Sequence, residues 1–178
     1  MSEDAKRKII DTLMELSLHV DIEKITVSQL VKKCNISRTL FYYYYQDIYD
    51  VLEDIITTGM DKIVAECIKF EEPRDSIRCF FQHYIEWVPL FKKVLHTKFY
   101  EKAEYMITQT TKKYLRIMLT HKAGDIAIRP DDAEFLIDFM SSGITVYFFQ
   151  HCEKGKIDID KFSDQFYLLI ISRFNTSL

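Results

Sequence analysis

The apolar positions of the chain recur with the period of an α-helix almost throughout, and no stretch shows the sustained alternation of a β-strand. The patterns break near Pro73 and Pro89, in the loop 122–130, and at the turn around Gly155. We therefore expect an all-α fold. The predicted helices span residues 3–20, 27–34, 38–45, 48–70, 75–87, 89–96, 101–122, 131–153 and 160–175.

The composition agrees with this pattern. Apolar residues make up 48% of the 178 residues, so a substantial core can form, and only 4 Gly and 3 Pro are present, which favours long helices. No apolar run is long enough to cross a bilayer and no signal peptide precedes Ile9, so we expect a cytoplasmic protein without membrane contact. The four cysteines form no CxxC pair, which is typical of thiols in a reducing compartment.

The segment 25–47 carries the strongest local signals. Thr26 and Gln29 have the spacing of a capping box, which predicts the start of one helix. Asn35 tolerates the left-handed conformation that ends a helix, and Ser37 is a preferred N-cap for the next one. A short helix, a tight turn and a second short helix, supported by the preceding helix 3–20, form a helix-turn-helix unit.

The second helix of this unit would lie in the DNA major groove. Phe41 and Tyr45, four residues apart, are expected to face the core, and Arg38 in the first turn has the side chain that best contacts guanine. The alternative is that the tyrosines pack between helices, but four consecutive aromatic residues cannot all point inward. The predicted DNA-binding residues are Thr26, Val27, Ser28, Ser37, Arg38, Thr39, Tyr42, Tyr43 and Tyr44.

This segment resembles the N-terminal domain of the TetR/AcrR family of transcriptional regulators, in particular a short-chain subset with an FYYxFxDIYD-like recognition helix. About 30 residues match without a gap. The resemblance is carried by Thr26-Val27, Cys34-Asn35-Ile36-Ser37, Leu40-Phe41-Tyr42-Tyr43-Tyr44-Tyr45 and Asp47-Ile48-Tyr49-Asp50-Val51-Leu52.

Two positions depart from the family pattern. Leu40 stands where the family usually has Thr or Ser, and Ile48 replaces a Lys that in the family approaches a phosphate. The net charge is −3 overall, and residues 1–47 hold equal numbers of acidic and basic residues. We therefore expect modest non-specific affinity for double-stranded DNA.

The resemblance implies a DNA-binding domain over 1–47 and a helical effector-binding and dimerisation domain over 48–178. The helices at 131–153 and 160–175 are apolar on most sides, which indicates burial on two sides. A homodimer interface meets this need and fits a palindromic operator, whereas a monomeric core is the alternative.

A small-molecule effector is implied only by the resemblance, and the aromatic residues that would line its pocket are equally typical of a core. If a pocket exists, it favours an apolar or aromatic effector. The candidate ligand-binding residues are Phe80, Tyr84, Trp87, Phe91, Tyr105, Tyr114, Met118, Phe139 and Tyr147.

No pattern in the chain favours catalysis or a cofactor. Cys79 and His83 have a spacing that can bind zinc, with Glu86 one turn further on, but no second cluster completes the set, so we expect no metal site. Phosphate loops, nucleophile elbows and HExxH motifs are missing from the sequence. We predict a homodimeric repressor released by an effector; the alternative is a regulator or coactivator controlled by a protein partner, and an all-α enzyme is least favoured.

Overall fold

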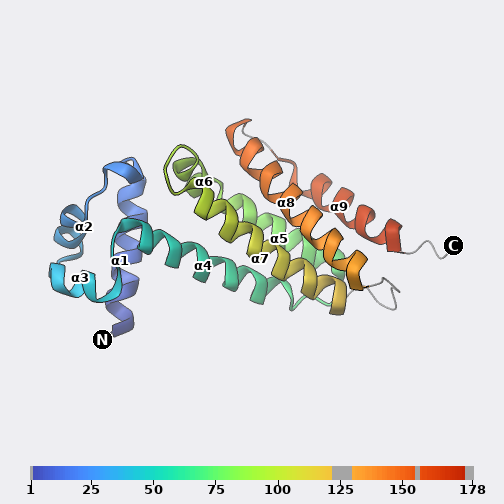
Figure 1. Ribbon diagram of the computed structural model, residues 1–178, viewed down its shortest axis with the longest axis horizontal. Coiled ribbons are helices and arrows are strands. Elements are labelled where there is room, and N and C mark those ends of the chain that lie inside the picture. The colour runs from blue at the N-terminus through green and yellow to red at the C-terminus, as the bar shows by residue number, and fades with distance from the viewer. Residues whose placement is uncertain (1, 122–129, 155–156, 175–178) are drawn as a thin grey trace. The chain divides into compact units, whose positions relative to one another are not determined.

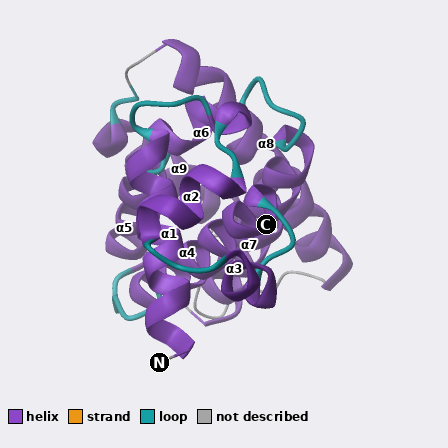
Figure 2. Cartoon of the chain, turned by 90° about the vertical axis from the view of Figure 1, so that its left-hand side faces the viewer, coloured by secondary structure: helices purple, strands orange, loops and turns teal. Residues whose placement is uncertain are grey.

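The computed structural model describes residues 2–121, 130–154 and 157–174, and these residues form helices and connecting loops without strands (Figure 2). The predicted all-α fold is confirmed. The helices of the described residues are α1 (Ser2–Ser17), the 3₁₀ helix η1 (Ile22–Lys24), α2 (Val27–Cys34), α3 (Arg38–Tyr44), α4 (Ile48–Cys67), α5 (Pro73–Glu86), α6 (Val88–Val94), α7 (Tyr100–His121), α8 (Pro130–Lys154) and α9 (Ile159–Phe174).

Helix ends agree with the sequence pattern best where a capping residue marks them. Both predicted ends of α2 are confirmed, whereas α4 ends at Cys67, three residues earlier than predicted. Residues 68–70 form a turn. Phe70 is 42% exposed, so its side chain gains little from burial that could stabilise a further helical turn. The predicted break at 19–24 contains η1, which buries Ile22 against the core.

The chain divides into two compact units, each with its own core. The first contains Met1–Gly59 and Lys93–Ala103, and the second contains Met60–Lys92 and Glu104–Leu178. Helices α4, α6 and α7 contribute residues to both units. The functional boundary after residue 47 stays a prediction.

In the first unit α1 packs on α2, and α2 packs on α3 (Figure 1). The core of these three helices is aliphatic except where α3 supplies Phe41. Ile9 and Leu13 of α1 and Leu30 of α2 are fully buried there, beside the small thiol of Cys34 at the end of α2. The Cys34 thiol donates to the Lys8 carbonyl across this contact, at 3.7 Å.

Asp54 of α4 joins three parts of the first unit. Its carboxylate accepts a hydrogen bond of 2.5 Å from the Tyr45 hydroxyl and pairs with the Lys6 ammonium at 3.1 Å. Thr58 donates to its other oxygen at 3.1 Å. Burial would raise the pKa of Asp54, but the hydrogen bonds from Tyr45 and Lys6 lower it below its usual range. Burial, and then the bond to Asp54, raise the pKa of Tyr45.

The core of the second unit is built from aromatic rings. Helix α5 packs along α9, and Phe81 of α5 lies 5.6 Å from Phe148 of α8 and 5.1 Å from Phe166 of α9, measured between ring centroids. Phe80 stacks on Tyr114 of α7 at 3.9 Å. Within the described part of the chain, no helix combines the length and the apolar character that spanning a membrane requires.

Replacing Tyr45 with Phe removes the hydroxyl that donates to Asp54 and leaves the packed ring in place. Because the acceptor is a partly buried carboxylate, we expect the free energy of unfolding at neutral pH to fall by about 1–2 kcal/mol in urea titrations. Tyr43→Phe is the matched control, since Tyr43 is 78% exposed. Its effect should stay within about 0.5 kcal/mol.

The pH dependence of this loss follows from the lowered pKa of Asp54. A carboxyl with a lowered folded pKa contributes stability above its unfolded pKa of about 3.9 and loses that contribution as the pH falls through the folded value. The gap between wild type and Tyr45→Phe should therefore narrow below about pH 4. A gap of the same size at neutral and acid pH would show that the carboxylate charge plays no part.

Candidate DNA-binding site

Helix α2 begins at a complete capping box. The Thr26 hydroxyl oxygen accepts a hydrogen bond from the Gln29 backbone N–H at 3.2 Å, and the Thr26 N–H donates to the Gln29 side chain at 2.8 Å. The predicted capping box is confirmed. It fixes the first turn of α2, whose inner side buries Leu30 and Val31. The outer side therefore exposes Thr26 and Ser28, while Val27 is half-buried.

The turn between the two helices depends on Asn35. Its φ of 52° and ψ of 50° place it in the left-handed region, and it is the one non-glycine residue with positive φ in the described part of the chain. Its N–H donates to the Lys32 carbonyl at 3.2 Å, and the Ile36 N–H donates to Val31 at 3.1 Å. Ser37 then caps α3 by accepting from the Leu40 N–H at 3.1 Å. Both predicted caps are confirmed.

Helix α3 has one buried side and one exposed side. Phe41 is fully buried and Tyr45, its C-cap, is 4% exposed. On the opposite side, Tyr42 is 56% and Tyr43 78% exposed. Tyr44 is half-buried, with its ring edge-on to Tyr43 at 4.9 Å. The exposed side thus offers two tyrosine hydroxyls, preceded in the first turn by the exposed Arg38 and Thr39.

Arg38 links the exposed sides of the two helices. Its guanidinium donates to the Ser28 hydroxyl of α2 at 2.6 Å. Among the residues that the structure describes, Arg38 forms no ion pair, so its charge is not neutralised by a carboxylate. A guanidinium has five N–H donors, so the bond to Ser28 orients the group and leaves donors for a ligand. The sequence pattern does not reveal this link, because it joins residues ten positions apart on different helices.

Several other basic residues of this unit form ion pairs. Lys33 pairs with Glu15 at 2.8 Å and Lys24 with Asp21 at 2.6 Å, all on the surface. Pairing lowers the local positive potential without adding much stability. The site therefore has little long-range attraction for phosphates beyond Arg38 and unpaired lysines.

The first turn of α4 lacks the phosphate-contacting Lys that the family resemblance implies. Ile48 is 6% exposed and lies in the core, so it offers no contact to a phosphate. Asp47 caps the helix by accepting from the backbone N–H groups of Tyr49 and Asp50, at 2.8 and 3.0 Å. A carboxylate already occupies this helix N-terminus, which disfavours a phosphate there.

The candidate ligand-binding residues separate into three groups. Five of them are buried in the core of the second unit: Phe80, Tyr84, Phe91, Tyr114 and Met118. Trp87 is half-buried with its ring 6.3 Å from Phe91, and Tyr105 is 64% exposed. Phe139 and Tyr147 line cavities on α8.

Among the core residues, polar groups are matched to one another. The Tyr84 hydroxyl lies 2.6 Å from the Thr111 hydroxyl, and the Tyr114 hydroxyl lies 3.1 Å from that of Ser76. Burial raises the pKa of Tyr84 to about 12. These hydroxyls are neutral and hydrogen-bonded, which is how a core accommodates tyrosine.

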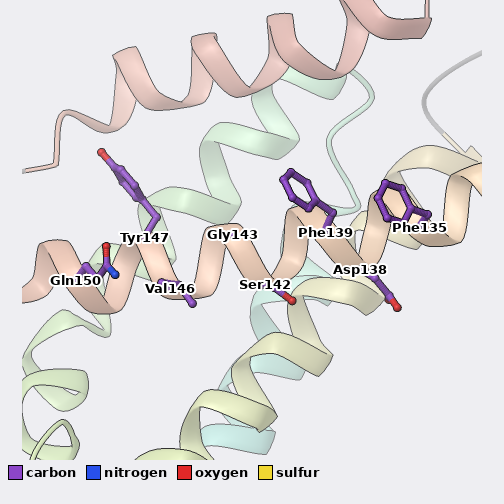
Figure 3. A pocket seen from close by; sticks show the side chains of 8 residues that line it. All are labelled: Phe135, Asp138, Phe139, Ser142, Gly143, Val146, Tyr147 and Gln150. Atoms are coloured by element: carbon purple, nitrogen blue, oxygen red, sulfur yellow. The ribbon is translucent and has the colours of Figure 1, made fainter.

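Two hollows lie along α8. A cavity of about 270 Å³ between α8 and α9 is lined by apolar groups that include Tyr147, Phe162 and Phe166. A wider surface hollow of about 620 Å³ follows α8 itself. Figure 3 shows Phe135, Phe139 and Tyr147 on one side of the helix and Asp138, Ser142 and Val146 on the other.

Comparison with known proteins adds a sequence relative. No family model matches the chain. A segment of 56 residues, 32% of this chain, is 34% identical to the uncharacterized HTH-type transcriptional regulator YxbF of Bacillus subtilis (strain 168). The match spans only 15% of the length of that relative. The likeness is confined to this segment, and it does not assign the chain to the TetR/AcrR family.

Two solved structures resemble the whole chain. Dihydroxyacetone kinase operon activator DhaS has a TM-score of 0.78, and fatty acid degradation regulator FadR from Bacillus halodurans has one of 0.64. Each likeness covers 96% of both chains at 14% sequence identity. The chain has the fold of these two regulators. An N-terminal helix-turn-helix followed by a larger helical part agrees with this fold.

Replacing Asn35 with Ala tests the turn that sets the angle between α2 and α3. A left-handed residue with a Cβ costs about 1–2 kcal/mol, whereas Gly adopts this conformation freely. Asn35→Ala should therefore lower the free energy of unfolding by about 1 kcal/mol, and Asn35→Gly should leave it nearly unchanged. Equal losses in the two variants, measured by urea titration, would show that the Asn side chain itself stabilises the turn.

Proposed function

We propose that this protein is a cytoplasmic, homodimeric DNA-binding transcriptional regulator of the TetR/AcrR type, with α3 as the recognition helix. The observation that carries the proposal is the exposed side of α3. Its inner side is held by buried Phe41 and Tyr45, while its outer side presents Arg38, Thr39 and the Tyr43 ring to solvent. The major groove of DNA is wide enough to admit an α-helix, and the exposed groups of α3 could contact base edges and phosphates there.

Each exposed group has a role in this proposal. Arg38 contacts guanine O6 and N7 in the major groove, since its fork matches these two acceptors. Thr39 contacts a neighbouring base edge, and the hydroxyls of Tyr42, Tyr43 and Tyr44 donate to phosphates. Thr26, Val27, Ser28 and Ser37 place the N-termini of α2 and α3 beside the DNA backbone.

A second copy of the chain is proposed to cover the exposed apolar side chains of α8 and α9. Phe135 and Phe139 of α8 are 67% and 69% exposed, and Leu168 and Leu169 of α9 are 56% and 51% exposed. Gly143 of α8 has nothing within 4 Å of where a Cβ would lie, so another helix can approach closely there. A two-fold dimer would place two recognition helices on a palindromic operator.

The dimer also compensates for the weak electrostatic attraction between DNA and one copy of residues 1–47. With equal numbers of acidic and basic residues in 1–47, a single copy gains little from counterion release. Joining two DNA-binding domains in one dimer makes the second binding event intramolecular and raises the overall affinity for DNA.

We propose that an apolar or aromatic effector releases the repressor by binding preferentially to one conformer. The cavity between α8 and α9, beside Phe139 and Tyr147, supports this role. The alternative is control by a protein partner, as a coactivator or activator, and buried Ile48, which offers no contact to a phosphate, favours it. DhaS, whose fold this chain shares, is a dihydroxyacetone kinase operon activator, which makes activation the second candidate role for this chain.

Arg38→Ala tests the DNA-reading role. Sequences bound by wild type are selected from random duplexes, and fluorescence anisotropy then gives Kd for the selected site and for a site changed at one guanine. We expect Arg38→Ala to weaken binding to the selected site by about 1–3 kcal/mol, roughly 5- to 150-fold, and to lose discrimination at that guanine. Arg38→Lys should keep the charge and also lose discrimination.

Arg7→Ala is the matched control, because Arg7 is an exposed arginine of α1 whose partner is Asp11. It should retain discrimination at every base pair. If Arg38→Ala weakens binding to all sequences equally, Arg38 contacts phosphate and not a base. If wild type selects no sequence at low salt, the chain alone is not a DNA reader and the protein-partner alternative gains support.

Phe139→Asp tests the dimer. Light scattering after gel filtration should give wild type twice the 21.2 kDa mass of one chain, and Phe139→Asp the mass of one chain. Tyr105→Asp changes a ring of similar exposure on α7 and should stay dimeric. A monomeric wild type at the same concentration would contradict the proposed interface.

A further inference from the structure

The end of α4 and one side of α5 bring together two thiols and an imidazole. One ligand atom from each of Cys67, Cys79 and His83 lies within 4.8 Å of both others. Cys79 and His83 are four residues apart on α5, and Cys67 is the last residue of α4. We predicted no metal site from the sequence, because the spacing of Cys79 and His83 along one helix does not show that Cys67 lies beside them.

A fourth donor stands beside the imidazole. His83 Nε2 lies 3.4 Å from the Glu66 carboxylate, and Nδ1 lies 2.9 Å from the Glu86 carboxylate. In the tautomer that carries its proton on Nδ1 and donates it to Glu86, the Nε2 lone pair is available to bind a metal. A histidine ligand held by a carboxylate on its other nitrogen is the usual arrangement at zinc sites.

Cys67, Cys79 and His83 are close enough to supply three ligands of a tetrahedral centre, and Glu66, which lies beside His83, would turn toward the thiols to become the fourth. Zn–N and Zn–O bonds of about 2.0–2.1 Å place two such ligands roughly 3.4 Å apart, close to the observed distance between Nε2 and Glu66. Zn–S bonds of about 2.3 Å require roughly 3.8 Å between the sulfurs. The Cys67 and Cys79 sulfurs are 2.7 Å apart, so one thiol would rotate outward by about 1 Å to bind.

We propose that Cys67, Cys79, His83 and Glu66 form a binding site for Zn²⁺ or a similarly soft divalent cation, with Glu86 as the positioning residue of His83. Two thiolates and one imidazole favour zinc over Mg²⁺ and Ca²⁺, which prefer oxygen ligands. The cation would tie the last residues of α4 to the middle of α5. This site lies in the second unit and does not depend on DNA binding.

The site has a route to solvent. The His83 side chain is 23% exposed and those of Glu66 and Glu86 are 60% and 63% exposed, while Cys67 is buried. A cation would therefore reach the carboxylate and imidazole first and the thiols last. Removing the Glu86 carboxylate leaves His83 without its orienting partner, a change that typically weakens metal binding roughly 10- to 100-fold.

Cobalt titration of the full chain, purified under reducing conditions without metal, tests the proposal. Co²⁺ bound to thiolates gives a near-ultraviolet charge-transfer band, and Zn²⁺ then displaces it stoichiometrically. We expect one equivalent of Co²⁺ to bind wild type with this band. Cys79→Ser should lose most of the band. His83→Gln should bind Co²⁺ more than about 100-fold more weakly, a larger loss than we expect on removing the Glu86 carboxylate, which only positions His83.

Cys34→Ser and His19→Gln are matched controls, since both residues lie in the first unit and outside the cluster. They should bind Co²⁺ as wild type does. Far-ultraviolet circular dichroism of each variant separates lost binding from lost folding, and Glu86→Gln, on the surface, should fold and bind more weakly. No thiolate band in reduced wild type overturns the proposal. Co²⁺ binding that is unchanged in Cys79→Ser and His83→Gln also overturns the proposal. So does a Cys67–Cys79 pair that forms a disulfide and binds no metal.

Discussion

The orientation of α3 depends on the burial of two aromatic rings, Phe41 and Tyr45, one helical turn apart. A helix of seven residues is not stable alone, and burying a large apolar side chain contributes about 1.5–3 kcal/mol. The hydroxyl of Tyr45 adds a bond to Asp54, which is also held by Lys6 of α1. Since one side of α3 is fixed this way, the rotation that exposes Arg38, Thr39 and Tyr43 follows from the packing.

The capping residues explain why this part of the fold was predictable from the sequence. Thr26, Gln29, Asn35 and Ser37 act through bonds to their own neighbours along the chain, so their identities and spacing suffice to place α2, the turn and α3. The end of α4 was placed less well, because residues 68–70 carry no comparable signal.

Contacts between different helices explain what the sequence did not provide. Ser28 and Arg38 meet only once α2 and α3 are packed, and Cys67 reaches Cys79 and His83 only when α4 ends beside α5. The aromatic residues show the same limit. Phe80 and Phe139 have equal apolar character in the sequence, yet one is buried against Tyr114 and the other is exposed on α8.

We propose that α3 reads bases in the major groove. Dimethyl sulfate probing of wild-type protein on its selected duplex tests this most directly, because the reagent methylates guanine N7 in the major groove and adenine N3 in the minor groove. We expect protection of guanine N7 in two symmetric half-sites, with adenine N3 between them still reactive. Protection of adenine N3 alone, or equal reactivity with and without protein, would contradict it.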